Sequence, residues 1–279
     1  MNLLGIDFED WFHPELIQKT LDTSKKKPTV INGIDKILDW LRKNDTYATF
    51  FMVGELIEQK PELLDKILDE DHEIGFHTMT HSRLDSPNFQ KIFENELIKF
   101  DKLTSGKSKG FRAPSFSLNS STSWAIDMLS KNHYEYDSSI VPAKTKLYGV
   151  PNAEKNPYFI SRKSIEKNDP HGNILEFPLL TTKIFGKTIP AGGGFYIRTF
   201  PLFLIKRAIQ ENNDKLIPAT FYIHSWELTP EFMPKLPLSF LDNFITYHNL
   251  EKTMEKMENI IKTFNFTSFS RYKKNNSKY

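Results

Sequence analysis

The chain of 279 residues contains no cysteine. Disulfide bonds, cysteine-ligated zinc and a thiol nucleophile are therefore excluded. An excess of charge of one sign is missing as well, because 37 basic residues stand against 35 acidic ones and the formal net charge is +2. This balance gives no electrostatic reason to expect a nucleic acid or an anionic membrane as partner.

Long apolar runs are also missing. No window of the sequence approaches the roughly 18 continuous apolar residues of a membrane span, so we expect no transmembrane segment. The N-terminus lacks a basic region, and its apolar run, MNLLGI, stops at acidic residues and is too short for a signal peptide. We therefore expect a cytoplasmic protein, and the sequence does not indicate its oligomeric state.

What the chain does contain is a regular alternation of strand-like and helical patterns. Helical spacing is clear at 33–44, where apolar residues recur three and four positions apart. Further helices are expected at 61–70, 88–100, 121–132, 201–213 and from about 241 to 264. Apolar strand-like runs lie at 3–7, 47–53, 72–76, 110–114, 134–139, 174–179, 219–224 and near 264–270.

This alternation predicts an α/β protein with seven or eight mostly parallel strands joined by helical crossovers. At this length a (β/α) barrel, regular or distorted, fits best, and an open doubly wound sheet is the alternative. Residues 142–173 interrupt the pattern and are rich in Lys, Asn and Pro. We expect them to form a surface excursion with little regular structure.

Polar residues gather where the predicted strands end, which is where barrels of this kind carry their chemistry. The third strand runs into His77 and His81. The other strand-end residues are Asp7, Glu9, Asp10, Arg112, Asp137 and His224. A single polar residue at a strand end is usually a cap or a turn, but five strand ends together indicate a site.

The spacing of His77 and His81 is the sharpest of these signals. On a helical turn, two imidazoles four residues apart face the same way, with about 5–6 Å between their Cβ atoms. That spacing suits two nitrogen ligands of one Zn²⁺, and a pair of surface histidines is the alternative. A cation there would also hold the carboxylates of Asp7, Glu9 and Asp10 ionised.

Several segments together resemble the polysaccharide deacetylases of the NodB-homology type, also called carbohydrate esterase family 4. In the family's order they are GIDFEDWFH, ATFFMVG, HEIGFHTMTH, GFRAPSFS, YEYDSSI and FYIHSWE, and they cover residues 1 to about 227. GGGFYIRTFP and the stretch YHNLEKTMEKMENIIKTFNF resemble the subfamily linked to exopolysaccharide and surface-polysaccharide loci. The resemblance implies one catalytic domain over 1–279, with a C-terminal helix and last strand at about 239–270.

The resemblance further implies a metal-dependent hydrolase that removes an N-acetyl or other N-acyl group from an amino sugar of a saccharide substrate. One divalent ion would be held by His77, His81 and an acid, with Zn²⁺ as first choice and Co²⁺, Ni²⁺ or Mn²⁺ as alternatives. A water on the metal would attack the acyl carbonyl. The resemblance assigns the general base to Asp7, its orientation to Arg112, the general acid to His224 and the orientation of that acid to Asp137.

The first motif departs from the family's common form, TFDDG, and this leaves the acidic ligand open. If Asp7 is the base, Glu9 is the metal ligand; the other alignment makes Glu9 the base and Asp10 the ligand. We favour the first because Asp7 and Glu9 lie on the same side of an extended strand, whereas Asp10 points the other way.

Two further residues are candidate substrate contacts. His13 could line the pocket, with a structural histidine as the alternative, and Trp226 could stack on a sugar face, with a core tryptophan as the alternative. Two other functions also stay open. One is a glycoside hydrolase that uses paired carboxylates, and the other is a catalytically silent relative that binds carbohydrate.

Overall fold

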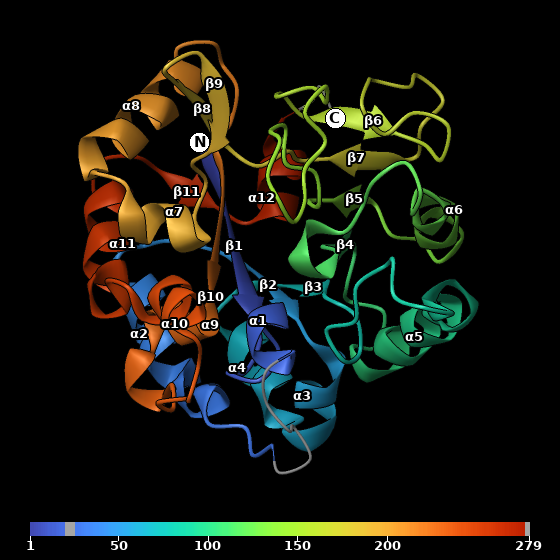
Figure 1. Ribbon diagram of the computed structural model, residues 1–279. Helices are drawn as coiled ribbons and strands as arrows, with labels where there is room; N and C mark the ends of the chain where they lie inside the picture. Colours follow the sequence, from blue (N-terminus) through green and yellow to red (C-terminus); the bar gives the residue numbers. More distant parts are fainter. Residues whose placement is uncertain (20–25, 277–279) are drawn as a thin grey trace.

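The computed structural model describes residues 1–19 and 26–276. A single curved sheet runs through its centre in the order β10-β1-β2-β3-β4-β5-β7-β6, and β11 pairs with β1 (Figure 1). Its strands are β1 (Asn2–Phe8), β2 (Thr49–Met52), β3 (Glu73–Phe76), β4 (Gly110–Phe111), β5 (Tyr136–Asp137), β6 (Tyr158–Ile160), β7 (Ile174–Glu176), β10 (Thr220–His224) and β11 (Phe266–Thr267). All pairings in this sheet are parallel except that of β6 with β7.

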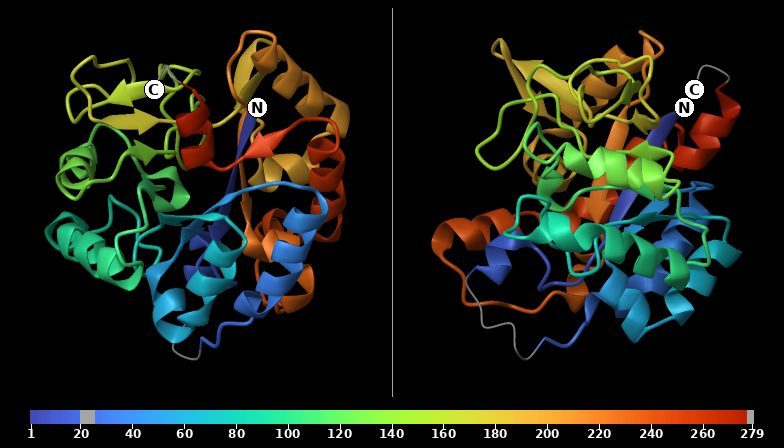
Figure 2. Two further views of the ribbon diagram at one scale, coloured as in Figure 1. Left: turned by 180° about the vertical axis from the view of Figure 1, so that it is seen from behind. Right: turned by 90° about the vertical axis from the view of Figure 1, so that its right-hand side faces the viewer.

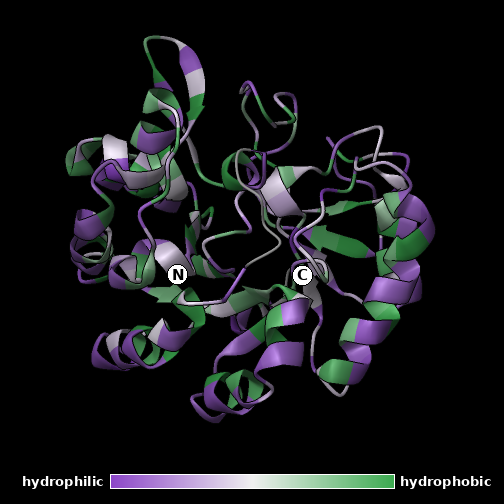
Figure 3. Cartoon of the chain, turned by 60° about the horizontal axis from the view of Figure 1, so that its bottom comes forward, coloured by the Kyte–Doolittle hydropathy of each residue, from purple (hydrophilic) through white to green (hydrophobic). Residues whose placement is uncertain are grey.

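Helices cover the outer face of the sheet, and a separate hairpin of β8 (Thr181–Ile184) and β9 (Lys187–Pro190) projects from it (Figures 1 and 2). Figure 3 shows hydrophobic and hydrophilic residues alternating along these helices, as expected when one face is buried. The helices are α1 (Glu15–Gln18), α2 (Ile34–Lys43), α3 (Gly54–Gln59), α4 (Glu62–Asp69), α5 (Phe89–Leu103), α6 (Trp124–Lys131), α7 (Gly194–Thr199), α8 (Leu202–Asn213), α9 (Ser225–Leu228), α10 (Phe240–Tyr247), α11 (Thr253–Ile261) and α12 (Phe269–Asn275).

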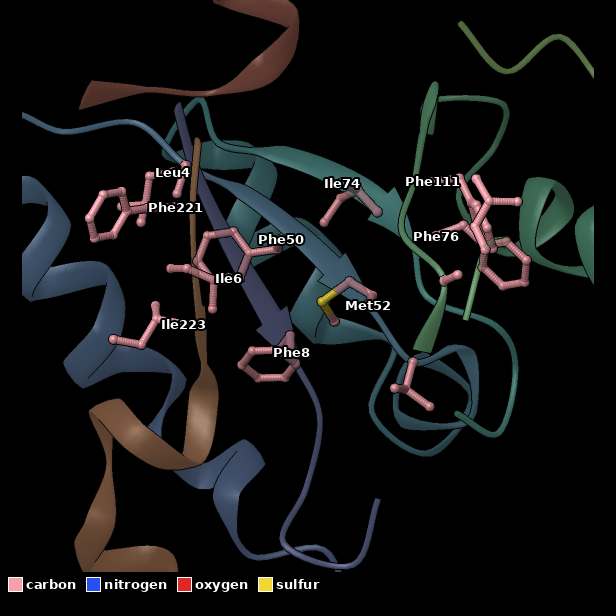
Figure 4. Packing of buried hydrophobic residues seen from close by; sticks show 14 of the residues in the cluster. Leu4, Ile6, Phe8, Phe50, Met52, Ile74, Phe76, Phe111, Phe221 and Ile223 are labelled. Carbon is pink, nitrogen blue, oxygen red and sulfur yellow. The ribbon is translucent and has the colours of Figure 1, made fainter. Parts of the chain in front are cut away.

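Successive side chains along β1 point to opposite faces of the sheet, so one set faces the helices and the other faces the inside of the curve. Leu4, Ile6 and Phe8 point to the helical side and join the main apolar cluster (Figure 4). Leu3 packs in a second cluster on the other side of the sheet, together with Phe269 of α12. Asp7 therefore belongs to the inner face of the curved sheet.

The predicted fold class is confirmed, because all eight expected strand regions are present and they form a mostly parallel, curled sheet. Among the described residues, β10 and β6 do not pair with each other, so the sheet is a half-barrel rather than a closed one. The excursion at 142–173 is only partly irregular, since β6 adds an antiparallel edge strand there.

One predicted helix is wrong. The stretch from about 241 to 264 is not continuous but is divided into α10, a 3₁₀ turn at Leu250–Lys252 and α11. The helix breaks because His248 is extended, with ψ of 122°, and Asn249 is left-handed, with φ of 51°. Among the described residues, no helix is both long enough and apolar enough to cross a membrane.

Candidate active site

The carboxyl ends of β1 and β10 point to the side of the molecule where α1, α9 and α10 lie (Figure 1). A cavity of about 160 Å³ opens there. Its lining comes from both halves of the chain and comprises Asp7, Glu9, Pro14, Glu15, Leu16, His77, His81, Ala113, Ser115, Phe116, Leu147, Tyr148, Phe195, Arg198, Tyr222, His224, Trp226, Ile245 and Thr246. Five of the predicted strand-end residues therefore share one pocket: Asp7, Glu9, His77, His81 and His224.

Glu9, His77 and His81 form a group whose ligand atoms all lie within 4.8 Å of one another, and all three residues are buried. Two nitrogens and one carboxylate oxygen are a common donor set for Zn²⁺ and for related divalent ions. Glu9 Oε2 is buried without a hydrogen bond, although His81 Nε2 lies 2.8 Å away. A cation between these residues would bind this oxygen and the His81 nitrogen together.

His77 is oriented as a metal-binding histidine usually is. Its Nδ1 lies 2.6 Å from the backbone oxygen of Arg112, so that Nδ1–H donates and Nε2 is left as the ligand atom. Burial is the main effect that lowers the pKa of His77, to about 4, and the ring is therefore neutral near pH 7. The geometry of the three residues thus fits a divalent metal, and His77 offers it a neutral ring.

The helical turn expected for His77 and His81 is wrong. Residues 77–81 form a loop in which Thr78 and His81 have φ of 58°. Their ring centroids are nevertheless 4.9 Å apart. Two left-handed residues without glycine are an uncommon local conformation, and such backbone strain is concentrated at functional sites.

The charge of Glu9 is stabilised from several directions. Burial alone would raise its pKa, but the imidazoles of His81, His224 and His77 outweigh burial and lower the pKa of Glu9 well below its usual range. Trp226 donates from Nε1 to Glu9 Oε1 across 2.9 Å. Glu9 is therefore a carboxylate, as a metal ligand must be.

Asp7 is held by the predicted arginine. Arg112 donates from Nη1 to Asp7 Oδ1 at 2.6 Å, and its other donors reach the backbone oxygen and the hydroxyl of Ser138. Arg112 is fully buried, and its guanidinium lies 4.1 Å from the ring centroid of Phe51. Gly5 makes room for it, because a Cβ there would be 2.6 Å from Arg112 Nη1.

His224 ends β10 directly beside β1, where it is the register partner of Asp7. Its Nδ1 lies 2.7 Å from Glu227 Oε2, and its ring stacks on Trp226 with 4.8 Å between centroids. Burial opposes protonation, but the charges of Glu227, Glu9 and Asp7 outweigh it and raise the pKa of His224 to about 9. An imidazolium has N–H groups that can donate a proton, and His224 lines the pocket.

Three predicted site residues, Asp10, His13 and Asp137, do not line the pocket. Asp10 accepts hydrogen bonds from the backbone N–H groups of Trp11, Thr29 and Ile31, so its oxygens are used within the loop. His13 is buried beside the site, where Nδ1 accepts from the backbone N–H of Asp10 and Nε2 lies 2.7 Å from Glu55 Oε1.

Asp137 does not contact His224, contrary to the expected pairing. It accepts hydrogen bonds from the hydroxyl and the N–H of Ser139. It is also the register partner of Glu176 on β7, where both residues are fully buried. Asp137 therefore lies next to Ser138, the serine that binds Arg112, and not next to the His224 ring.

Glu227 is the residue that sequence reasoning missed. It lies three residues after His224, at the start of α9, and also accepts a hydrogen bond from the backbone N–H of His224. A carboxylate three positions after a helix-capping residue is a recognised sequence pattern. That spacing could have identified Glu227 instead of Asp137 as the partner of the imidazole.

Comparison with family models divides the chain into two matched segments. Residues 15–135 match the model described as polysaccharide deacetylase. Residues 138–274 match a model described as a domain of unknown function, DUF3473. The pocket takes residues from both segments and from the N-terminal strand that precedes them.

Curated relatives match shorter stretches. A peptidoglycan-N-acetylglucosamine deacetylase of Bacillus cereus is 33% identical over 97 residues, which are 33% of this chain and 35% of the relative. A chitooligosaccharide deacetylase of a Bradyrhizobium species is 42% identical over 48 residues, which are 17% of this chain and 22% of the relative. The chain thus spans about a third of the length of the first of these relatives and less of the second.

Solved structures show the same fold over almost the whole chain. A Mycobacterium smegmatis protein with a provisional polysaccharide deacetylase name matches with a TM-score of 0.59 and 14% identity, over 98% of this chain and 90% of the other. A Pseudomonas aeruginosa protein with a similar provisional name gives a TM-score of 0.54 and 12% identity, over 97% and 89%. Residues 15–135 thus carry a polysaccharide deacetylase domain of the NodB-homology type, carbohydrate esterase family 4, and the chain as a whole shares the fold of these two solved structures.

Proposed function

We propose that this chain is a metal-dependent hydrolase that removes the N-acetyl group from an amino sugar of a polysaccharide or of its precursor. One observation carries the proposal: the Glu9–His77–His81 group shares a pocket with Asp7 and His224. In metal-assisted amide hydrolysis a Lewis acid polarises the carbonyl, a general base activates the water, and a general acid protonates the leaving amine. The names of two relatives, a peptidoglycan-N-acetylglucosamine deacetylase and a chitooligosaccharide deacetylase, support this substrate class.

Glu9, His77 and His81 would hold the metal. A divalent cation there, with Zn²⁺ as first candidate and Co²⁺, Ni²⁺ or Mn²⁺ as alternatives, would supply Lewis-acid polarisation of the acetamide carbonyl. Of the two alignments of the first motif, we propose the one in which Glu9 is the ligand. Asp10 has no place in it, since its carboxylate is engaged by backbone N–H groups.

Asp7 would take the proton from the attacking water. Arg112 keeps the carboxylate in one orientation, because its remaining donors are fixed by Ser138. His224 would then give a proton from Nε2 to the departing amine, a poor leaving group until it is protonated. Glu227 holds Nδ1 and so points Nε2 towards Glu9 and the pocket.

The pocket suits a sugar ring. Phe116, Tyr148, Phe195 and Trp226 contribute aromatic surface to its lining. We propose that one of these rings stacks on the amino sugar. Trp226, the candidate from the sequence, is 5% exposed, stacks on His224 and packs in an apolar cluster, which favours its alternative as a core tryptophan. Phe116, Tyr148 and Phe195 are then the remaining candidates.

The two matched segments are proposed to act as one catalytic unit. β1 lies between β2 and β10, so a strand from the far part of the chain completes the sheet at the site. The glycoside hydrolase alternative needs a carboxylic acid that stays protonated. Glu9 is ionised and Asp10 is turned away from the pocket, so the arrangement favours the deacetylase.

The test measures metal content and acetate release together. Purified protein is loaded with Zn²⁺, Co²⁺, Ni²⁺ or Mn²⁺ in turn and incubated with N-acetylated mono- and oligosaccharides. We expect bound metal and acetate release that stops after chelation and returns with metal. Turnover that survives complete removal of metal would favour a glycoside hydrolase. Sugar binding without acetate release at any metal loading would favour the silent relative.

A further inference from the structure

The three glycines at 192–194 place α7 in direct contact with β10. Gly193 has φ of 128° and forms an isolated parallel bridge with Tyr222. A Cβ at Gly193 would lie 1.6 Å from the backbone oxygen of Tyr222, and one at Gly194 would lie 2.3 Å from its hydroxyl. Any side chain at these positions would push α7 away from the strand that carries His224.

In this position, α7 places the buried guanidinium of Arg198 next to Glu227, the residue that binds His224. Arg198 is 2% exposed and donates from Nε to Glu227 Oε1 at 2.6 Å. The other oxygen of Glu227 accepts from His224, from both Nδ1 and the backbone N–H. The carboxylate of Glu227 is therefore fixed at both oxygens, one by the arginine and one by the histidine.

The far side of the same guanidinium is fixed as well. Arg198 Nη2 donates to the backbone oxygen of Ile245, and Nη1 donates to those of Thr246 and His248. These are carbonyls at the end of α10, where a helix leaves its last carbonyls without partners within the helix. Ile245 and Thr246 also line the pocket, so the helix that Arg198 caps forms part of the wall of the site.

We propose that Arg198 is the positioning residue for His224, acting through Glu227, and that the same side chain fixes α10 as the pocket wall. Only an arginine fits this role, because its planar fork offers donors in three directions at once. A lysine would supply the charge but could not hold Glu227 and the three carbonyls together. The inference rests on the proposed function and adds a residue that does not touch the reacting atoms.

The test uses the difference between an amide and an activated ester. An amine leaving group needs the proton from His224, whereas the phenolate of an aryl acetate needs it much less. In Arg198→Lys, Glu227 keeps a cation nearby but loses its fixed geometry. We expect kcat for an N-acetylated sugar to fall by about 10²-fold, as for a misplaced group. KM should change little, and aryl acetate hydrolysis should fall far less.

Three controls separate positioning from loss of structure. In Lys256→Met, the ammonium that binds the carbonyls of Ile197, Arg198 and Phe200 is lost, while Glu227 keeps its arginine. This variant should lose stability and keep the wild-type ratio of amide to ester rates. The metal content of Arg198→Lys should equal that of the wild type. The histidine ¹⁵N spectrum should show an altered Nδ1 signal for His224.

A double variant gives the deciding result. If Arg198 acts through His224, adding Arg198→Lys to His224→Ala should lower the amide rate no further. An equal loss of amide and ester turnover, or an additive effect in the double variant, would overturn the inference. Absence of amide turnover in the metal-loaded wild-type protein would instead overturn the proposed function. The ¹⁵N signal of His224 would still report on Arg198 in that case.

Discussion

Arg112 Nη1 and Asp7 Oδ1 lie 2.6 Å apart in an environment closed to solvent, with Arg112 fully buried and Asp7 3% exposed. Removing one partner of a buried pair leaves the other charge without compensation, which costs about 3–5 kcal/mol. Metal-free Arg112→Met should therefore lose about that much free energy of unfolding in urea. Arg42→Met, which changes an exposed arginine, should stay within about 0.5 kcal/mol. If Arg112→Met also lost no more than about 0.5 kcal/mol of free energy of unfolding, another group would have to compensate Asp7.

Glu9 and Asp10 are adjacent acids with different partners, and this separates the two alignments of the first motif. Glu9→Gln should weaken metal binding by more than about 100-fold, since loss of an outer-shell partner already costs 10–100-fold. Asp10→Asn should keep the metal, because its carboxylate binds backbone N–H groups. Competition with a chromophoric chelator measures both affinities. If Asp10→Asn is the variant that releases the metal, the assignment of Glu9 fails.

His224 should be needed for the amide and much less for an ester. A positioned acid contributes about 10²–10⁴-fold, so kcat of His224→Ala towards an N-acetylated sugar should fall by about that factor. Its metal content should stay at the wild-type level, because the Glu9–His77–His81 group is intact. His133→Ala, at a histidine outside the pocket, is the matched control. Wild-type amide turnover in His224→Ala would show that the proton comes from another group.

Glu176 predicts a measurable dependence of stability on pH. Burial, followed by the charge of Asp137, raises the pKa of Glu176 well above its ordinary value of 4.5. The folded state then keeps a proton that the unfolded state has released. The stability due to Glu176 is complete below pH 4.5 and is lost as pH rises towards the folded pKa.

Glu176→Gln keeps the shape and the donor of the protonated acid but cannot ionise. We expect its stability relative to the wild type to improve steadily as pH rises above about 5, measured by urea unfolding of metal-free protein. Glu135→Gln, at a half-exposed acid next to β5, is the matched control for the change of side chain. A constant difference between Glu176→Gln and the wild type would contradict the raised pKa of Glu176.

The strands of this fold could be read from the sequence because most are buried in a parallel sheet, where apolar residues are nearly continuous. The helical break at Asn249 could not be read in the same way. Apolar spacing continues through that position, and the break depends on distant partners. Asn249 Nδ2 donates to the backbone oxygen of Arg198, fifty-one positions away.

Some features of the site could be predicted from local sequence patterns, whereas others depend on contacts between distant segments. The strand-end rule located Asp7, His77 and Arg112, because carboxyl ends of parallel strands meet at one edge. The spacing of His77 and His81 correctly indicated that they lie together, but their backbone is a strained loop and not a helix. The partner of His224 was misplaced on Asp137, although the capping spacing from His224 to Glu227 is present in the sequence.

The position of β1 between β2 and β10 has a consequence for synthesis of the chain. Asp7 is made first and His224 last among the proposed catalytic residues, yet the two are register partners on neighbouring strands. Until β10 emerges from the ribosome, β1 keeps one open, apolar edge, and such edges promote aggregation. Nascent chains that stop short of residue 220 should therefore depend on chaperones more than the finished protein does, because β1 can pair with β2 early but must wait for β10.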